Sequence, residues 1–321
     1  MNRREFIGAV SSAAVASPLA ANAQTKIPRV GALVLTDAVA QVFGKELREG
    51  MRELGYAEGQ SYVLEIRSAD GVATRLAPLA AELVQLKVDV IVAVFTPCAL
   101  AARQATSEIP IVLAAAGDPV GTGLVASLAR PGGNVTGLSN MAAETAGKSV
   151  ELFRDMLPSL HGVAVLANPD DPFSKSLLEQ VGLTGRTAGI EIAPIAMVRT
   201  PDQLEDAFAS IAREQASAVV VQAIFFAKAV ADFALKYRLP SASVLRSYAD
   251  IGGLISYGAD LPHIYRRSAA FVQKILQGAR AADLPVEQPT KFELVINLRT
   301  AKAMGLRIPE SFLLRADTIL E

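Results

Sequence analysis

Cysteine, histidine and tryptophan are scarce in this chain of 321 residues. It has one cysteine, Cys98, two histidines, His161 and His263, and no tryptophan. A single cysteine excludes an internal disulfide. Metal centres and Cys/His catalytic sites need several such side chains together, so the sequence offers almost no material for either. We therefore expect no metal and no cofactor.

An excess of charge of one sign is also missing. The chain carries 31 basic and 32 acidic side chains, which gives a formal net charge of −1 at pH 7. Nucleic-acid-binding proteins present clustered positive charge to the phosphate backbone. The composition therefore points to no nucleic-acid partner.

The apolar run at the start of the chain is too short to cross a membrane. Arg3-Arg4 precedes a stretch of small apolar residues at 9–21, which ends in Ala21-Asn22-Ala23. Paired arginines, a short apolar region and an Ala-x-Ala site are typical of a twin-arginine export signal. A membrane span needs about 20 predominantly apolar residues. We expect residues 1–23 to be removed and the mature protein to work in the periplasm without inserting into the membrane.

Apolar strands and amphipathic helices alternate along the rest of the chain. Segment 30–115 follows a β-α-β-α-β-α-β pattern, and a second such pattern runs over 163–257. Strands that are apolar on both sides are typical of parallel sheets covered by helices. Nearly three hundred residues exceed what one core usually organises. The sequence therefore predicts an α/β protein with two Rossmann-like lobes, and the helix expected at 261–276 and strand at 292–297 suggest that the chain crosses between them repeatedly.

Two strand ends are candidate ligand contacts. The apolar strand 111–115 ends at Gly117-Asp118-Pro119, and Thr96 follows the strand 88–94. Open α/β sheets bind ligands at the carboxyl ends of their strands. Asp118 is either a ligand contact or a turn former that bonds its own backbone. Thr96 before Pro97 predicts an N-cap, whose helix start either holds a carboxylate or is simply capped.

Other motifs are weaker. Segment 142–149 ends like a phosphate-binding loop, but Ala142 occupies the place of the first glycine, so we expect no nucleotide there. Asp170-Asp171 is interpreted as a helix entry rather than an acid/base pair. Phe225-Phe226 is either core packing or an apolar pocket wall. No Ser-His-Asp set can be assembled, so no catalytic residue is predicted.

Several runs resemble one known family. They include Asp-Pro-Val-Gly at 118–121, Pro-Gly-Gly-Asn-Val-Thr-Gly at 131–137 and Gln-Pro-Thr-Lys-Phe-Glu at 288–293. They are similar to the ABC-transporter substrate-binding family that includes tryptophan/tyrosine-type receptors. The resemblance implies a type I periplasmic-binding fold with a hinge of about three crossings. The first lobe would comprise 28–138 plus 262–285, and the second 139–261 plus 286–321.

The same resemblance implies a ligand site between the lobes. Groups of the first lobe would grip a carboxylate, and groups of the second would hold an amine. The residues assigned in this way are Thr36, Thr96 and Asp118 from the first lobe, and Asn140, Asn168, Gln222 and Tyr257 from the second. Aromatic-amino-acid receptors of this group are expected to carry an acidic residue near position 222. Because glutamine is uncharged, the sequence leaves both an amino acid and a related organic acid open as ligands.

Three functions remain compatible with the sequence. The resemblance favours a periplasmic receptor that closes on a small organic ligand, an aromatic or branched amino acid or a related acid, and delivers it to an inner-membrane ABC permease. A ligand-sensing subunit of a membrane signalling system is the alternative. An enzyme on the same scaffold is the third possibility, since fold alone does not decide activity.

Overall fold

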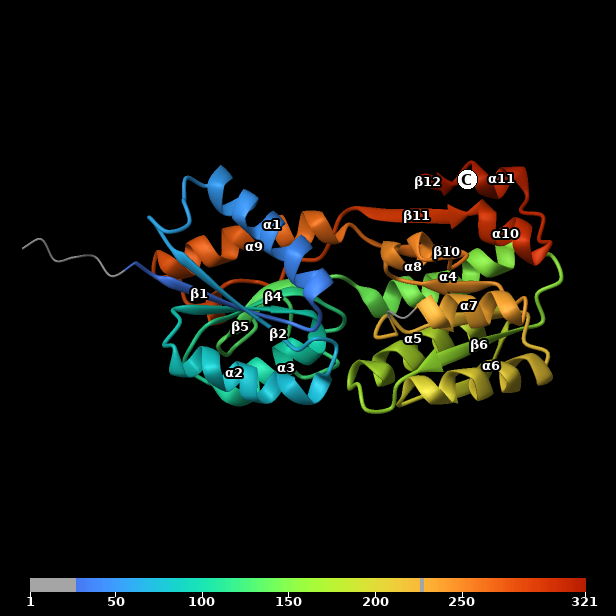
Figure 1. Ribbon diagram of the computed structural model, residues 1–321, viewed down its shortest axis with the longest axis horizontal. Coiled ribbons are helices and arrows are strands. Elements are labelled where there is room, and N and C mark those ends of the chain that lie inside the picture. Colours follow the sequence, from blue (N-terminus) through green and yellow to red (C-terminus); the bar gives the residue numbers. More distant parts are fainter. Residues whose placement is uncertain (1–26, 226–227) are drawn as a thin grey trace, which may run out of the picture.

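The structure is a computed structural model that describes residues 27–225 and 228–321. The predicted export signal, residues 1–23, lies outside this range. The described strands form two separate sheets, one of five strands and one of seven, and each sheet is the centre of one lobe (Figure 1). The predicted two-lobed α/β fold is confirmed.

The first sheet is parallel throughout, in the order β2-β1-β3-β4-β5. Its strands are β1 (Arg29–Val34), β2 (Val63–Ser68), β3 (Val90–Val94), β4 (Ile111–Ala116) and β5 (Val135–Ser139). Helices α1 (Asp37–Glu53) and α9 (Leu261–Leu276) pack together on one face, and α2 (Leu76–Gln85) and α3 (Phe95–Ala105) cover the other. Because both faces are covered, β3 and β4 are buried along their whole length.

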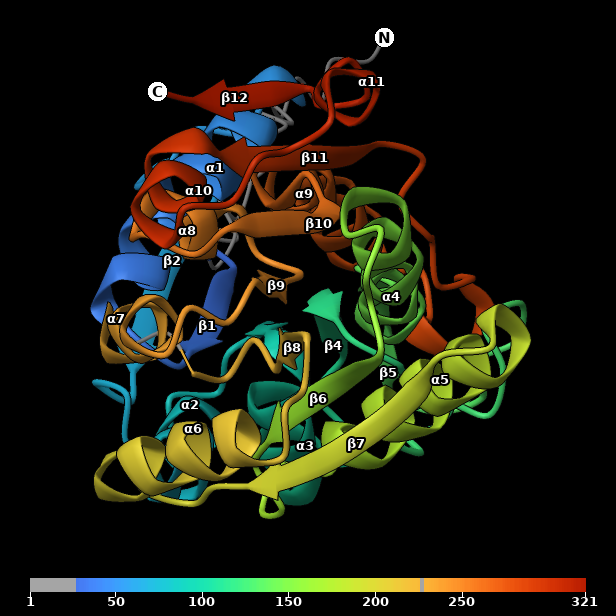
Figure 2. The same cartoon turned by 90° about the vertical axis from the view of Figure 1, so that its right-hand side faces the viewer.

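The second sheet has the order β12-β11-β10-β9-β8-β6-β7. Its strands are β6 (Gly162–Ala167), β7 (Glu191–Met197), β8 (Ala218–Val221), β9 (Ser241–Ser243), β10 (Ile255–Ala259), β11 (Phe292–Asn297) and β12 (Thr318–Leu320). Only the β10–β11 pair among these described strands is antiparallel. Figure 2 shows β7 and β12 at the two opposite edges.

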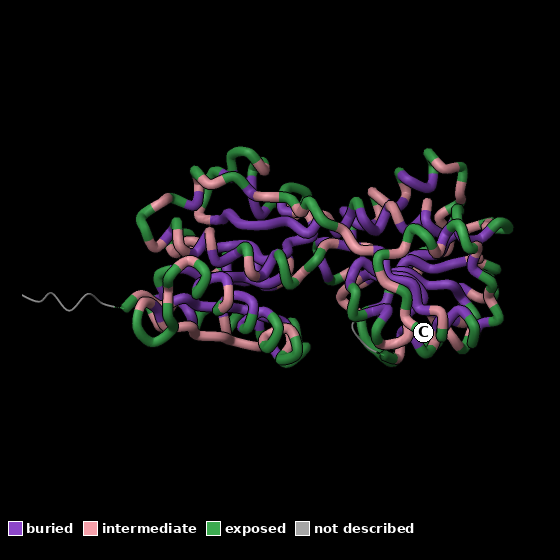
Figure 3. Tube along the Cα trace, turned by 90° about the horizontal axis from the view of Figure 1, so that it is seen from above, coloured by how far each residue is buried: buried purple, intermediate pink, exposed green. Residues whose placement is uncertain are grey.

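Helices cover both faces of the second sheet as well. They are α4 (Ala142–Met156), α5 (Phe173–Ala188), α6 (Leu204–Arg213), α7 (Lys228–Lys236), α8 (Arg246–Asp250), α10 (Leu298–Met304) and α11 (Glu310–Leu313). The pair α4 and α5 packs on one face, and the pair α6 and α7 on the other. Figure 3 shows the result as two buried centres, each enclosed by more exposed chain.

The described chain passes between the sheets at three places. It leaves β5 for α4 at 139–142, returns from β10 to α9 at 259–261, and crosses again at 287–292 to β11. The third crossing begins where Glu287 bridges to Leu138 of β5. All three crossings connect the two lobes along the same side of the molecule. The carboxyl ends of the two sheets therefore face each other.

Local sequence explains where several elements begin and end. The Thr36 hydroxyl accepts a hydrogen bond from the Val39 amide at 3.3 Å and so caps α1. Gly55, with φ of +84°, follows the end of that helix. Segment 142–149, which resembles a phosphate loop in sequence, forms the first turns of α4 instead. Among the described helices, none is both long and apolar enough to cross a membrane.

Candidate functional site

The carboxyl ends of the two sheets enclose a small cavity between the lobes. We call this cavity of about 50 Å³ the inner cavity. The residues that line it come from the ends of both sheets: Leu35, Phe95, Thr96, Pro97, Ala115, Gly117, Asn140 and Ala142, and Asp171, Phe173, Gln222, Ala223, Ile224 and Leu245. Most of these side chains are apolar, with a few polar groups among them, which is the usual composition of a small-molecule site.

A wider space, the outer cleft, adjoins the inner cavity. Its volume is about 1130 Å³, and it shares Phe95, Ala223 and Leu245 with the inner cavity. The first turn of α1 lines one side, α8 lines the other, and residues 290–293 of the third crossing line its base. The two spaces together therefore form one continuous candidate site that touches both lobes and the hinge.

Two residues of the inner cavity have unusual backbone angles. Phe95 has φ of +68° and Ala115 has φ of +72°, both in the left-handed region. Such a conformation costs about 1–3 kcal/mol for a residue other than glycine, and it is concentrated at functional sites. The strain at two adjacent strand ends, β3 and β4, supports a functional role for this end of the first sheet.

A buried hydrogen-bond network provides the polar groups of the second lobe. Gln222 Oε1 accepts from the Asn168 amide at 2.7 Å and from the Ser174 hydroxyl at 2.9 Å. This fixes the orientation of the amide, and Gln222 Nε2 donates to Asp171 Oδ2 at 2.7 Å. Asp171 Oδ1 accepts from the Phe173 amide at 3.0 Å. Gln222 thus acts on the inner cavity by holding the Asp171 carboxylate in place.

Asp171 is a buried acid with no basic partner among the residues that the structure describes. Its side chain belongs to a residue only 7% exposed. Burial raises the pKa of the Asp171 carboxyl above its ordinary value, while the bonds from Phe173 and Gln222 oppose the rise. No lysine, arginine or histidine of the described chain forms an ion pair with it. A buried carboxylate of this kind is stabilised when a cation enters the cavity beside it.

The first lobe and the first crossing contribute donors. Asn140 is 5% exposed, and its Oδ1 accepts from the Ala142 amide at 3.1 Å. Its Nδ2 has no hydrogen-bond partner among the described residues and belongs to a side chain that lines the inner cavity. The first turn of α3 also lines this cavity, and no side chain caps that helix. Uncapped N–H groups at a helix start favour an anion.

The prediction that Thr96 caps a helix is wrong. The left-handed Phe95 lets α3 begin two residues earlier, with Val94 as its N-cap, so Thr96 lies inside the first turn. The Thr96 hydroxyl instead accepts from the Gly117 amide at 3.1 Å and joins the ends of β3 and β4. Thr96 still lines the inner cavity.

The structure brings some predicted site residues together and leaves others apart. Thr96, Asn140 and Gln222 line the inner cavity, and Thr36 lines the outer cleft. Asn168 lines neither space, and its Oδ1 accepts from the Asp170 amide at 2.9 Å.

Asp118 and Tyr257 also lie outside both spaces. Asp118 Oδ1 accepts from the Gly121 amide at 2.8 Å, as expected of the turn-forming alternative. The Tyr257 ring stacks on Phe292, with centroids 6.1 Å apart, and packs against the core of the second lobe.

The residues of the site that the sequence prediction misses include one buried acid and two aromatic side chains. They are Asp171, Phe95 and Phe173, all of which line the inner cavity. Asp171 does stand at a helix entry, as interpreted, because it accepts from the Phe173 amide. The available signal is its position just after an apolar strand, where ligand-binding residues gather. Of the adjacent aromatic pair, Phe225 lines the outer cleft, and Phe226 lies outside the described residues.

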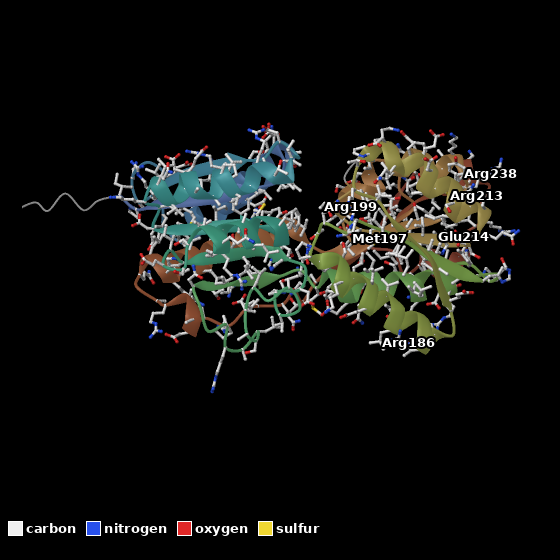
Figure 4. All side chains as sticks on the ribbon, turned by 90° about the horizontal axis from the view of Figure 1, so that it is seen from below. Arg186, Met197, Arg199, Arg213, Glu214 and Arg238 are labelled. Atoms are coloured by element: carbon white, nitrogen blue, oxygen red, sulfur yellow. The ribbon has the colours of Figure 1, made fainter. Side chains whose placement is uncertain are left out.

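A third space of about 430 Å³ lies within the second lobe alone. It runs between β7 and α6, with Met197, Arg213 and Glu214 in its lining. Figure 4 shows Met197 close to Arg199, on the part of the lobe nearer the first lobe, and Arg213 and Glu214 farther from it. This groove touches only one lobe, so it is not part of the site between the lobes. No group of three or more potential metal-binding side chains occurs among residues 27–225 and 228–321.

Two parallel-dominated lobes with a candidate site between their carboxyl edges define a type I periplasmic-binding protein. Solved structures agree. A conserved domain protein from Vibrio cholerae superposes with a TM-score of 0.85 at 29% identity, over 92% of this chain and 100% of that one. The ABC domain in complex with L-Trp from Streptococcus pneumoniae gives 0.84 at 25% identity, over 91% and 99% of the two chains.

Sequence comparison identifies the family. Residues 29–320 match the family of ABC transporter substrate binding proteins, so the chain belongs to that family. A curated relative, the tyrosine-binding protein of Clostridioides difficile strain R20291, is 25% identical over 265 residues, covering 81% of this chain and 75% of that protein.

Proposed function

We propose that this protein is the receptor of an ABC importer for an α-amino acid with an aromatic or other large apolar side chain. The observation that carries the proposal is the buried Asp171 carboxylate, which lines the inner cavity and has no basic partner in the described part of the chain. It supplies the negative charge that Gln222 lacks. The names of two relatives, one tyrosine-binding and one solved with L-Trp, support the same ligand class.

Each part of such a ligand has a counterpart in the site. The ammonium group would pair with Asp171, since a charge-assisted hydrogen bond in a buried site is strong. The carboxylate would accept from Asn140 Nδ2 and from the uncapped first turn of α3. The side chain would extend past Phe95 into the outer cleft, where Phe225 and other apolar residues form the walls.

Binding would be coupled to lobe closure. We propose that 28–138 with 262–285 moves as one body and 139–261 with 286–321 as the other. Because the ligand touches both lobes only when they are together, it stabilises the closed state by its difference in affinity for the two states. The closed receptor would then deliver its ligand to an inner-membrane permease, after export through the twin-arginine signal to the periplasm.

The two alternatives differ from the importer in the fate of the bound ligand. A sensing subunit would close in the same way but bind a membrane signalling protein, and co-purification with a signalling protein rather than a permease would favour it. An enzyme would convert its ligand during incubation. We propose a non-enzymatic receptor, since the polar groups of the inner cavity form a binding set with no paired nucleophile and base.

The test is a binding panel measured by calorimetry and thermal unfolding of the purified chain. It contains L-tryptophan, L-tyrosine, L-phenylalanine and L-leucine, together with 3-phenylpropanoate, which lacks the ammonium, and 2-phenylethylamine, which lacks the carboxylate. A ligand at a hundred times its Kd should add about 2.7 kcal/mol to the free energy of unfolding. We expect at least one amino acid to bind and both analogues to bind much more weakly. Equal binding of 3-phenylpropanoate would contradict the ammonium site.

A further inference from the structure

The turn that follows β4 is held in one shape by its own hydrogen bonds. Asp118 Oδ1 accepts from the Gly121 amide at 2.8 Å, and the Thr122 hydroxyl donates to the Asp118 carbonyl at 2.5 Å. At the start of the turn, the Gly117 amide donates to the Thr96 hydroxyl. Residues 117–121 therefore present a fixed surface at the edge of the inner cavity.

This turn of the first lobe touches the first turns of α5 in the second lobe. A Cβ atom placed on Gly117 would lie 2.7 Å from the Phe173 ring. One placed on Gly121 would collide first with Asp118 Oδ2 of its own turn and would also lie 2.8 Å from Ser176 Oγ. Phe173 and Ser176 are three residues apart and share one face of the helix. Both are buried, at 6% and 8% exposure. At Gly117 the lobes approach so closely that only glycine leaves room, and at Gly121 both the Asp118 carboxylate and Ser176 limit the space.

The turn also faces the start of α4. Burial is the main cause that raises the pKa of the Glu144 carboxyl, and the negative charge of Asp118 adds to the rise. The turn at 117–121 of the first lobe thus packs against the starts of α4 and α5 in the second lobe. In the described chain, the two lobes are connected only through the hinge.

We propose that residues 117–121 form a closure seat, the surface on which the second lobe comes to rest when the receptor closes on its ligand. Asp118 and Gly121 are positioning residues in this account: neither lines the inner cavity, and each acts through the fit between the lobes. The closure seat depends on the proposed receptor function in one respect only, namely that binding of a ligand drives closure. The closure seat explains why Asp118, an acidic residue beside the site, forms a hydrogen bond within its own turn.

A closure seat has a distinct effect on binding. Bulk placed in it disfavours the closed state and leaves the open state alone, so the apparent affinity falls although no ligand contact is lost. Ser176→Leu should therefore weaken binding of the best amino acid of the panel by about tenfold, because overpacking of a tight contact is unfavourable. Ser176→Ala should bind like the wild type. Lys175→Leu, at a neighbouring side chain that is 81% exposed, is the matched control and should also leave affinity unchanged.

Disulfide trapping tests the seat directly. In the Gly121→Cys/Ser176→Cys variant, the new Cβ at position 121 would lie 2.8 Å from the place of the Ser176 Oγ atom, a separation suited to a disulfide. Asp118→Ala is added to this pair and to its control, because the Asp118 carboxylate would otherwise collide with that Cβ. Gly133→Cys/Ser176→Cys is the control, since a Cβ on Gly133 has no neighbour within 4 Å. The native Cys98 thiol is buried and its pKa is raised by burial, so it does not compete.

We expect the 121/176 pair to cross-link under mild oxidation, the control pair not to, and L-tryptophan or L-tyrosine to increase the rate. Failure of the 121/176 pair to cross-link with or without these amino acids would overturn the closure seat, even if calorimetry shows that they bind. Cross-linking at a rate that no amino acid of the panel changes would leave the seat standing and contradict the proposed ligand class.

Discussion

The substitution Asp171→Asn removes the charge that the proposed ammonium site needs. It keeps the size of the side chain, and the asparagine oxygen can still accept from the Phe173 amide. The residue is 7% exposed, so an ammonium pairs with it in a largely water-free place. Removing one partner of such a buried charge pair costs about 3 kcal/mol, which corresponds to a loss of affinity of about 150-fold.

A double-mutant cycle separates this charge effect from general damage to the site. Calorimetry would measure wild type and Asp171→Asn, each with L-phenylalanine and with 3-phenylpropanoate. The wild type should prefer the amino acid by about a hundredfold, and the variant should lose most of that preference because only one of the two ligands carries an ammonium. Weaker binding of both ligands by the same factor would mean that Asp171 has only a structural role.

The adjacent acid provides the matched control. Asp170 lies in the same loop, but its side chain is 64% exposed and its Oδ1 accepts from Arg199 Nε at 3.2 Å. Asp170→Asn should leave both affinities within about twofold of wild type, since exposed ion pairs contribute about 0–1 kcal/mol. Equal losses for Asp170→Asn and Asp171→Asn would refute the assignment.

The pH dependence of binding gives an independent check. Burial raises the pKa of Asp171 in the free protein, so the protonated form persists to a higher pH than in an exposed aspartate. Only the ionised form pairs with an ammonium. Affinity should therefore fall as the pH drops through the raised pKa, and the free protein should release a proton on binding in that range. Asp171→Asn should abolish this dependence.

Three further predictions concern stability, each measured by denaturant unfolding. Gln222→Glu should destabilise the protein at pH 7 by about 2 kcal/mol or more, because a second carboxylate would face Asp171 at about 2.7 Å, and stability should recover as the pH falls and one acid is protonated. Glu287→Gln should cost less than about 1 kcal/mol, since its ion pair with Arg267 is largely solvated. The wild-type contribution should disappear as the pH falls through the lowered pKa of Glu287. Phe208→Ala in the core of the second lobe should cost about 3–5 kcal/mol, and a loss below about 1 kcal/mol would contradict its burial.

Much of the fold follows from local sequence patterns. Strands such as β3 and β4 are apolar along their whole length because helices cover both faces of the sheet. Such a continuous apolar run can be recognised in the sequence alone. Helix α4 is different, since the sequence patterns predict no helix over 142–156. Its N-cap is Met141, in the left-handed region at φ of +53°, and no side chain of that residue makes a cap. The Ala142 amide is satisfied by Asn140 instead, a signal that common N-cap patterns do not include.

The site is harder to predict because its parts come from distant loops. In the sequence, the uncharged Gln222 stands at the end of β8, where an acidic residue is expected. In the structure its Nε2 holds Asp171, 51 residues earlier in the chain, so the charge is supplied from the end of the neighbouring strand β6. The local pattern marks Asp171 correctly as a helix entry but carries no information on the cavity that this residue also lines. The adjacency of β6 and β8 in the sheet supplies that information.

The most direct measurement is a crystal structure of the chain with the tightest-binding amino acid of the panel. The account predicts the ligand between the lobes, with its ammonium nitrogen within about 3 Å of an Asp171 oxygen and its carboxylate near Asn140 Nδ2 and the start of α3. An amino acid bound between the lobes with its ammonium turned away from Asp171, or bound elsewhere on the molecule, would contradict it.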